Sequence, residues 1–198
     1  MADASGPGPG GRPGSRTGRG PRSSSGSRSR AGSGAPLEEA KALALRVLAF
    51  HARSQAQLRA RLTRAGFEAE ADEVLAWATR LGYLDDAAYA RARARALLGT
   101  QRVGPRRAEE RLRAAGIEAA RARLAVAQAA EERAEGRREG EPAELALCRD
   151  ALARKLRGRE LAGLDERERG RLARFLLGRG FSSAAVARLI PLRWDSES

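Results

Sequence analysis

The chain has 198 residues and a formal net charge of +13, and 42% of its residues are apolar although only 4% are aromatic. Its core must therefore consist mainly of Leu, Val and Ala, which suits closely packed helices. The excess of basic residues favours polyanionic partners such as nucleic acid or an acidic protein face. Lys41 and Lys155 are the only lysines among 38 basic residues, and this preference for Arg also fits a bias in base composition.

The single cysteine and the single histidine exclude several classes of site. Cys148 has no partner for an intramolecular disulfide, so we expect a reducing compartment, the cytoplasm. A zinc site of the usual kind needs three or four Cys or His ligands, and the chain has only Cys148 and His51. We therefore expect no metal and no other cofactor. No apolar run approaches the roughly 20 residues that cross a bilayer.

Residues 1–36 differ in composition from the rest of the chain. They contain ten Gly, five Pro, six Arg and one Asp, and after Met1 they lack apolar side chains large enough to form a core. Burial there cannot offset the loss of chain entropy, so we expect a disordered tail. Such a tail either binds nucleic acid weakly or serves only as a solubilising arm.

Helical patterns begin after this tail. Leu43, Val47 and Phe50 follow the spacing of one helix face. Ser54 followed by Gln57 is a capping-box pattern, which predicts that a second helix begins there. A third apolar helical pattern occupies "EAEADEVLAWATRLG", whereas alternating strand patterns are nearly absent.

The stretch "LGYLDDAAYARARARALL" joins this third helix to a fourth. Gly82 is expected to end one helix, and Tyr83 and Leu84 can pack into the junction, although Tyr83 could instead contact a partner. Asp85 or Asp86 is expected to cap the next helix. A catalytic pair of carboxylates is a weaker interpretation, because no metal ligand, base or pocket accompanies these acids.

A fifth helical pattern, "VGPRRAEERLRAAGI", ends as an earlier and a later helix do. In each of the three, two small or apolar residues and a glycine are spaced four apart, and a large apolar residue follows. The glycines are Gly66, Gly116 and Gly180, separated by 50 and then 64 residues. This recurrence predicts three tandem three-helix repeats. The extra 14 residues are assigned to the polar stretch 130–143.

These patterns divide the chain into consecutive segments. The expected segments are a tail (1–36), a first repeat (37–84), a second repeat (85–129), an insertion (130–143), a third repeat (144–192) and a C-terminal tail (193–198). The fold class is therefore predicted to be all-α.

The sequence resembles the RecX family, the modulators of the bacterial recombinase RecA. The resemblance covers roughly residues 37–192 and rests on three motifs in order: "HARSQAQLRARLTRAGF", "GYLDDAAYARARAR" and "GTQRVGPRRAEERLRAAGI". It implies an elongated, curved protein of three helical repeats. It also implies that the protein binds along the groove of the RecA–DNA filament and inhibits recombinase activity in DNA repair and recombination. We expect it to act as a monomer. The tail and the insertion depart from the family pattern.

Arginines of the first two repeats are the candidate contacts to such a partner, because a guanidinium can bind a carboxylate or a phosphate through two parallel hydrogen bonds. The candidates are Arg59, Arg61, Arg64, Arg91, Arg95, Arg102, Arg106, Arg107, Arg111 and Arg113. Arg102, Arg106 and Arg107 surround an expected helix start, where free backbone N–H groups also favour anions. Each arginine could equally belong to a solvated helix face.

Three functions remain open at this point. The protein could modulate a recombinase filament, bind nucleic acid without sequence preference, or serve as a helical scaffold for other proteins. An enzyme is not expected, because one His and one Cys supply no nucleophile–base or metal constellation.

Overall fold

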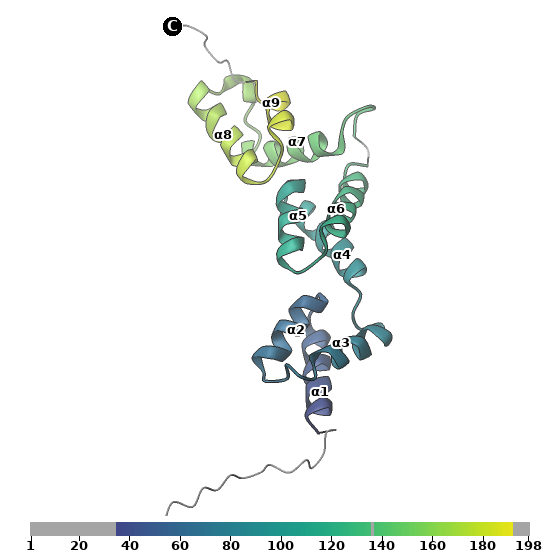
Figure 1. The fold of residues 1–198 in the computed structure, drawn as a ribbon. Helices are drawn as coiled ribbons and strands as arrows, with labels where there is room; N and C mark the ends of the chain where they lie inside the picture. Colours follow the sequence, from purple (N-terminus) through teal and green to yellow (C-terminus); the bar gives the residue numbers. More distant parts are fainter. Residues whose placement is uncertain (1–34, 136, 192–198) are drawn as a thin grey trace, which may run out of the picture. The chain divides into compact units, whose positions relative to one another are not determined.

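The first repeat is a bundle of three helices. The computed structural model describes residues 35–135 and 137–191. Helices α1 (Ala35–Phe50), α2 (Gln55–Arg64) and α3 (Ala71–Arg80) each pack against the other two (Figure 1). The first helix thus begins slightly before the expected start of the repeat. The expected disordered tail lies outside the described residues, apart from its last two positions.

The second repeat has the same organisation. Helices α4 (Asp86–Leu98), α5 (Pro105–Ala114) and α6 (Ala119–Arg133) pack on one another. Pro105 is the first residue of α5, where its missing N–H leaves no hydrogen bond unmade. The expected boundary between the repeat and the insertion is not a helix end, because α6 continues through the start of the insertion to Arg133.

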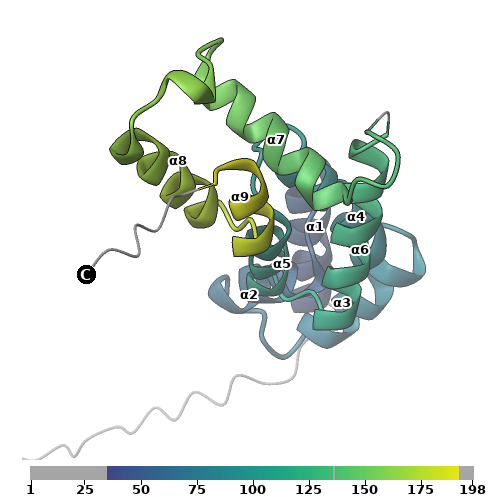
Figure 2. The same cartoon turned by 90° about the horizontal axis from the view of Figure 1, so that it is seen from above.

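The third repeat comprises α7 (Ala143–Leu156), a short 3-10 turn (Leu161–Gly163), α8 (Glu166–Gly178) and α9 (Ser183–Leu189). Its three α-helices pack together, and α7 also contacts α6 of the second repeat (Figure 2). All regular structure in the described part of the chain is helical, which confirms the predicted all-α fold of tandem three-helix repeats. The elongated, curved form expected for the repeats stays a prediction.

The three glycine motifs form the same turn. After α2, the Phe67 N–H donates to the Leu62 carbonyl at 3.0 Å, and after α5 the Ile117 N–H donates to Leu112 at 3.1 Å. After α8, the Phe181 N–H donates in the same way to the Leu176 carbonyl at 3.3 Å. This bond, across a glycine with positive φ, defines the Schellman ending of a helix. The recurrence in the sequence therefore reflects a recurrent local structure.

Each repeat is joined to the next by the same pair of segments, the start of its second helix and the glycine turn of the following repeat. The Ser54 hydroxyl, at the start of α2, donates to the carbonyl of Ala115 in the turn after α5. The Gly104 N–H, at the start of α5, donates at 2.7 Å to the carbonyl of Arg179 in the turn after α8. The start of the second helix of one repeat therefore contacts the glycine turn of the following repeat.

The buried apolar residues form two cores. One core belongs to the first repeat and includes Leu58, Leu62 and Leu84. The other is continuous through the second and third repeats, and it includes Leu112 and Leu176. Many positions in both cores are alanines, which lets the helices approach closely. Within the described residues, no helix has the length and apolar character that crossing a membrane requires.

Candidate interaction groove

The short connection between α1 and α2 is held firmly at Ser54. This serine is fully buried, accepts the Gln57 N–H at 3.2 Å and donates its hydroxyl proton to the second repeat. The Gln57 side chain in turn accepts the Ser54 N–H, completing the predicted capping box. Because Ser54 is fixed on both sides, it sets the position of its neighbour Arg53.

The paired acids of the sequence have two different structural tasks. Asp85 accepts the N–H groups of Ala87 and Ala88 at 2.8 and 2.9 Å and is the cap of α4. The hydrogen bond from Ala88 lowers the pKa of Asp85 below its ordinary value. Asp86 reaches the first repeat instead, where it accepts the Gln55 N–H at 2.8 Å. It thus supplies a partner for a free N–H at the start of α2.

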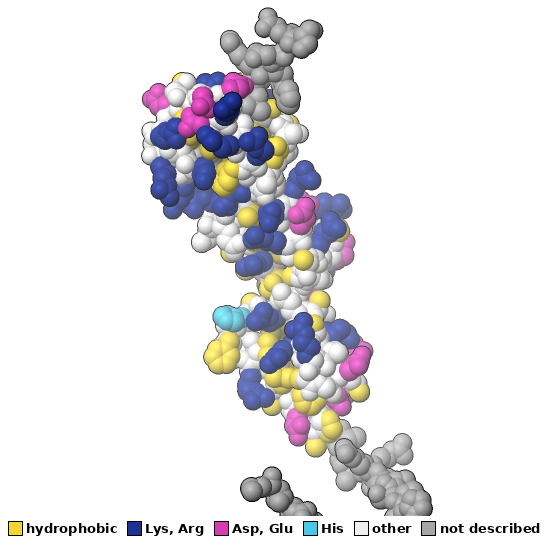
Figure 3. Space-filling model, turned by 90° about the vertical axis from the view of Figure 1, so that its left-hand side faces the viewer, with side chains coloured by type: hydrophobic (Ala, Val, Ile, Leu, Met, Phe, Trp, Pro, Cys, Tyr) yellow, Lys and Arg dark blue, Asp and Glu magenta, His cyan; other side chains and the backbone are white. Residues whose placement is uncertain are grey.

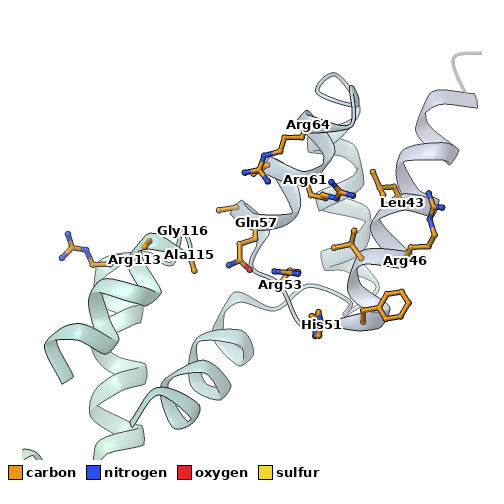
Figure 4. A pocket seen from close by; sticks show the side chains of 15 residues that line it. Leu43, Arg46, His51, Arg53, Gln57, Arg61, Arg64, Arg113, Ala115 and Gly116 are labelled. Atoms are coloured by element: carbon orange, nitrogen blue, oxygen red, sulfur yellow. The ribbon is translucent and has the colours of Figure 1, made fainter. Parts of the chain in front are cut away.

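These contacts place α1, α2 and the turn after α5 around one groove of about 840 Å³, which we call the interaction groove. Its cationic side chains come from both the first and the second repeat: Arg46, Arg53, Arg61, Arg64 and Arg113. In Figure 4, Arg61 leaves α2 toward α1, whereas Arg64 leaves it toward the turn at Gly116. Arginines that are far apart in sequence therefore share one surface.

Apolar groups accompany the arginines in the interaction groove. Leu43, Val47 and Phe50, the predicted stripe of α1, all contribute to its lining. The ring of Phe50 is 81% exposed, so this end of the stripe is not part of the core. A surface that combines exposed apolar groups with cations suits a partner that carries both apolar and anionic groups.

The arginines of the groove have no acidic neighbours in its lining, and within the described residues none of the five forms an ion pair. A guanidinium without a counter-charge is available to bind a carboxylate or phosphate. Cationic side chains are also numerous across the face shown in Figure 3, whereas acidic ones lie mostly near its margins. The groove is therefore the strongest candidate for an anion-binding interface.

Three of the ten candidate arginines from the sequence, Arg61, Arg64 and Arg113, meet in this groove. Two others are paired within their own repeats. Arg59 pairs with Asp72, and Arg95 forms two hydrogen bonds with Glu132, at 2.6 and 2.9 Å.

The cluster expected at the start of α5 does not form a single free surface. Arg107 donates at 2.8 Å to the carbonyl of Gly178 and so belongs to the contact between the second and third repeats. Arg102 lines a separate pocket beside the third repeat, while Arg106 is exposed on α5. Arg111 donates to the Gln101 side chain, and Arg91 is exposed on α4.

Leu84, which the sequence places at the junction after the third helix, is buried in the first core with 2% exposure. Tyr83 remains 53% exposed and lies beside Trp77, with ring centroids 6.2 Å apart. Gly82 has positive φ at the end of α3, as the sequence predicts.

Two groove residues, Arg46 and Arg53, were not among the sequence-based candidates. Arg46 lies between Leu43 and Val47 on α1, and this position beside an apolar stripe was a usable signal. Arg53 directly precedes the capping residue, where a side chain is well positioned by the turn. Nothing in the sequence indicates that Arg113 lies near Arg46 or Arg53, because this proximity depends on how the repeats stack.

Comparisons with known families agree with this architecture. The family pattern described as RecX, first three-helix domain, matches residues 40–77, and that of the third three-helix domain matches residues 143–190. Two solved structures have similar folds. The chain matches a crystal structure of regulatory protein RecX with a TM-score of 0.63 and 24% identity, over 79% of this chain and 73% of that one. It also matches a crystal structure of RecX from Lactobacillus salivarius with a TM-score of 0.64 and 20% identity, over 79% of this chain and 95% of that one.

Two relatives are similar in sequence over most of their length. Regulatory protein RecX of Streptomyces coelicolor is 31% identical over 82% of this chain and 81% of its own. Regulatory protein RecX of Thermus thermophilus is 37% identical over 72% of this chain and 84% of its own. From these similarities and its successive three-helix repeats, the chain is a member of the RecX family.

Proposed function

We propose that this protein is a regulator that binds a RecA-type recombinase filament on DNA and restrains its activity in DNA repair and recombination. The observation that carries the proposal is the interaction groove of a RecX-family chain, in which five arginines without ion-pair partners surround apolar side chains. A recombinase filament offers both acidic protein surface and DNA phosphates. The proposed role is one of binding, without catalysis, by a monomer in the cytoplasm.

The repeated architecture supports binding to a polymer. The helices pack mainly within their own repeat, and α6 and α7 join the second repeat to the third, so successive repeats can contact successive sites on a long partner. Several weak contacts then act together, because each bound site raises the effective concentration at the next. The groove, formed by two repeats, is one such site.

The test is a titration of DNA-dependent ATP hydrolysis by the recombinase. We expect hydrolysis to fall when this protein is present below the recombinase concentration. The variant Arg61→Gln, Arg64→Gln, Arg113→Gln should need about tenfold more protein for half inhibition, equivalent to ~1.4 kcal/mol of binding energy. Unchanged hydrolysis at a several-fold excess of the wild-type protein would contradict the proposal.

A matched control separates the groove from total charge. Arg80, Arg121 and Arg123 are exposed and lie outside the groove, and their replacement by Gln removes the same three charges. We expect this control to inhibit nearly as well as the wild type. Equal weakening in both triple variants would mean that net charge, and not the groove, governs binding.

A second candidate function is direct binding of nucleic acid without sequence preference, favoured by the net charge of +13. In that case the protein should bind bare DNA as tightly as it binds the filament, and this binding should weaken steeply as salt rises. If the protein is instead a scaffold for unrelated proteins, its partners should still be recovered in a pull-down after nuclease treatment.

A further inference from the structure

A second cationic pocket lies where the second and third repeats meet. It has a volume of about 190 Å³ and is lined by residues from the loop before α5 and from α7 and α8. We call it the joint pocket. Its cations are Arg102, Arg154, Lys155 and Arg179.

Two of these cations are positioned by one aromatic ring. The Nζ of Lys155 lies 5.0 Å from the centroid of Phe175, and the guanidinium carbon of Arg179 lies 5.1 Å from it. Arg179 also donates at 3.0 Å to the carbonyl of Gln101, across the joint. Cation–π contacts of this kind hold charged groups in place while leaving part of their hydrogen-bonding capacity free.

The backbone holds Arg102 at this pocket. Its φ is +49°, in the left-handed region that non-glycine residues seldom adopt. The next two residues are fixed, since Val103 is buried and Gly104 packs against the turn at Gly180. The tight packing on one side therefore maintains an unfavourable conformation that brings an arginine to the pocket.

The joint pocket contains an unbalanced positive charge. None of its lining residues is acidic, and in the described part of the chain none of its four cations forms an ion pair. Cations held this close repel one another, so a bound anion would be stabilised by all four. The volume suits a compact group such as phosphate better than a peptide segment with side chains.

An adjoining pocket extends this cationic surface. It shares Lys155 and Phe175 with the joint pocket and adds Arg159 and Arg171, although Arg159 pairs with Glu168 at 2.7 Å. Cations that line two adjoining pockets suit a chain of phosphates better than a single anion. A nucleic-acid strand carries a regular series of negative charges, and its bases can stack on aromatic side chains such as the half-buried Phe175.

We propose that the joint pocket binds a backbone phosphate of a nucleic-acid strand. This inference deepens the proposed function, because it gives the regulator a direct contact with the DNA of the filament. The site is distinct from the interaction groove, which lies between the first and second repeats. A phosphate here contacts residues of two repeats and so strengthens their joint.

The experiment measures binding of a fluorescent oligothymidylate by anisotropy, without recombinase. Arg102→Gln combined with Arg154→Gln removes two charges from the pocket. We expect affinity to fall about tenfold at low salt, and the slope of log affinity against log salt to become shallower by about 0.7, since the pocket neutralises one phosphate and each phosphate of a single strand contributes about 0.7. Equal affinity and slope in variant and wild type would overturn the proposal.

Controls separate this site from general electrostatics and from unfolding. Arg121→Gln with Arg123→Gln removes the same charge from exposed positions on α6 and should change affinity much less. Both double variants should retain the circular dichroism signal and melting temperature of the wild type. If the first is unfolded, Arg154→Gln with Lys155→Gln replaces it, because both side chains are exposed.

Two competitors identify the chemistry of the ligand. Inorganic phosphate should displace the oligonucleotide only at high concentration, whereas polyglutamate of matched charge should compete poorly. Competition by polyglutamate as strong as by unlabelled oligothymidylate, and lost in the pocket variant, would assign the site to acidic protein and overturn the proposal. Because no recombinase is present, these outcomes are separate from failure of filament inhibition.

Discussion

At the scale of single residues, the glycine turns show how one local motif acquires different roles. Gly66 and Gly116 both have positive φ and both end a helix in the same way. A Cβ atom at Gly66 would meet nothing within 4 Å, whereas at Gly116 it would lie 2.2 Å from the Cβ of Ala56. Gly180 is similarly crowded, because a Cβ atom added there would lie 2.5 Å from the Cβ of Arg107. The last two glycines are therefore required by the stacking of repeats as well as by the turn.

The first prediction compares Gly116→Ala with Gly66→Ala. Both variants should lose about 1–2 kcal/mol of unfolding free energy, because alanine is strained in the left-handed region. Gly116→Ala should lose about 1–3 kcal/mol more, because its methyl group overpacks the joint. Urea denaturation measures both. Equal losses in the two variants would show that the close approach of Ala56 is not a tight contact.

The second prediction concerns the thiol of Cys148. The residue is fully buried in the core of the second and third repeats, and burial raises the pKa of the thiol to about 12. The reactive form of cysteine is the thiolate, so the folded protein should react very slowly with a thiol reagent near neutral pH. Full reaction is expected in denaturant. Rapid reaction of the folded protein would contradict this burial.

At the scale of elements, the helices are fixed chiefly at their ends. Hydrophobic stripes predict that helices exist, and capping residues predict where they begin. Asp85 caps its own helix, whereas Asp86 reaches the start of α2 in another repeat. The second contact links two elements that are separated along the chain.

The third prediction is a pH dependence at the Asp85 cap. Because the folded pKa lies below the ordinary value of 3.8, the ionised cap stabilises the protein above that value, and this stability is lost as pH falls through the folded pKa. Asn can cap a helix without ionising. Asp85→Asn should therefore show a smaller loss of unfolding free energy between about pH 5 and about pH 2.

The control for this experiment is Asp85→Ala, which removes the cap itself. It should be less stable than Asp85→Asn at every pH above the ordinary pKa. Urea midpoints across the pH range provide the measurement. An acid-induced loss in Asp85→Asn as large as in the wild type would mean that Asp85 does not contribute to it.

Element identity was largely predictable from the sequence, but the candidate site was not. The Ser54–Gln57 capping box and the three glycine endings are local, because they depend on residues a few positions apart. The interaction groove depends on stacking, which brings Arg113 to Arg61 from another repeat. Arg107 illustrates the reverse case, since its charge suggested a partner but its guanidinium contacts the adjoining repeat.

At the scale of the whole molecule, one contact recurs between successive repeats. The start of α2 meets the turn after α5, and the start of α5 meets the turn after α8. The first contact borders the interaction groove, and the second borders the joint pocket. Each junction therefore gathers arginines from two repeats, and the proposed binding surfaces arise from the repeat architecture itself.

The most direct test is equilibrium binding of labelled protein to a preformed recombinase filament on DNA, compared with the same DNA alone. The wild type should bind the filament at least about tenfold more tightly than the DNA, a difference of ~1.4 kcal/mol. The Arg61→Gln, Arg64→Gln, Arg113→Gln variant should lose most of that difference. Equal affinity of the wild type for filament and bare DNA would contradict the account.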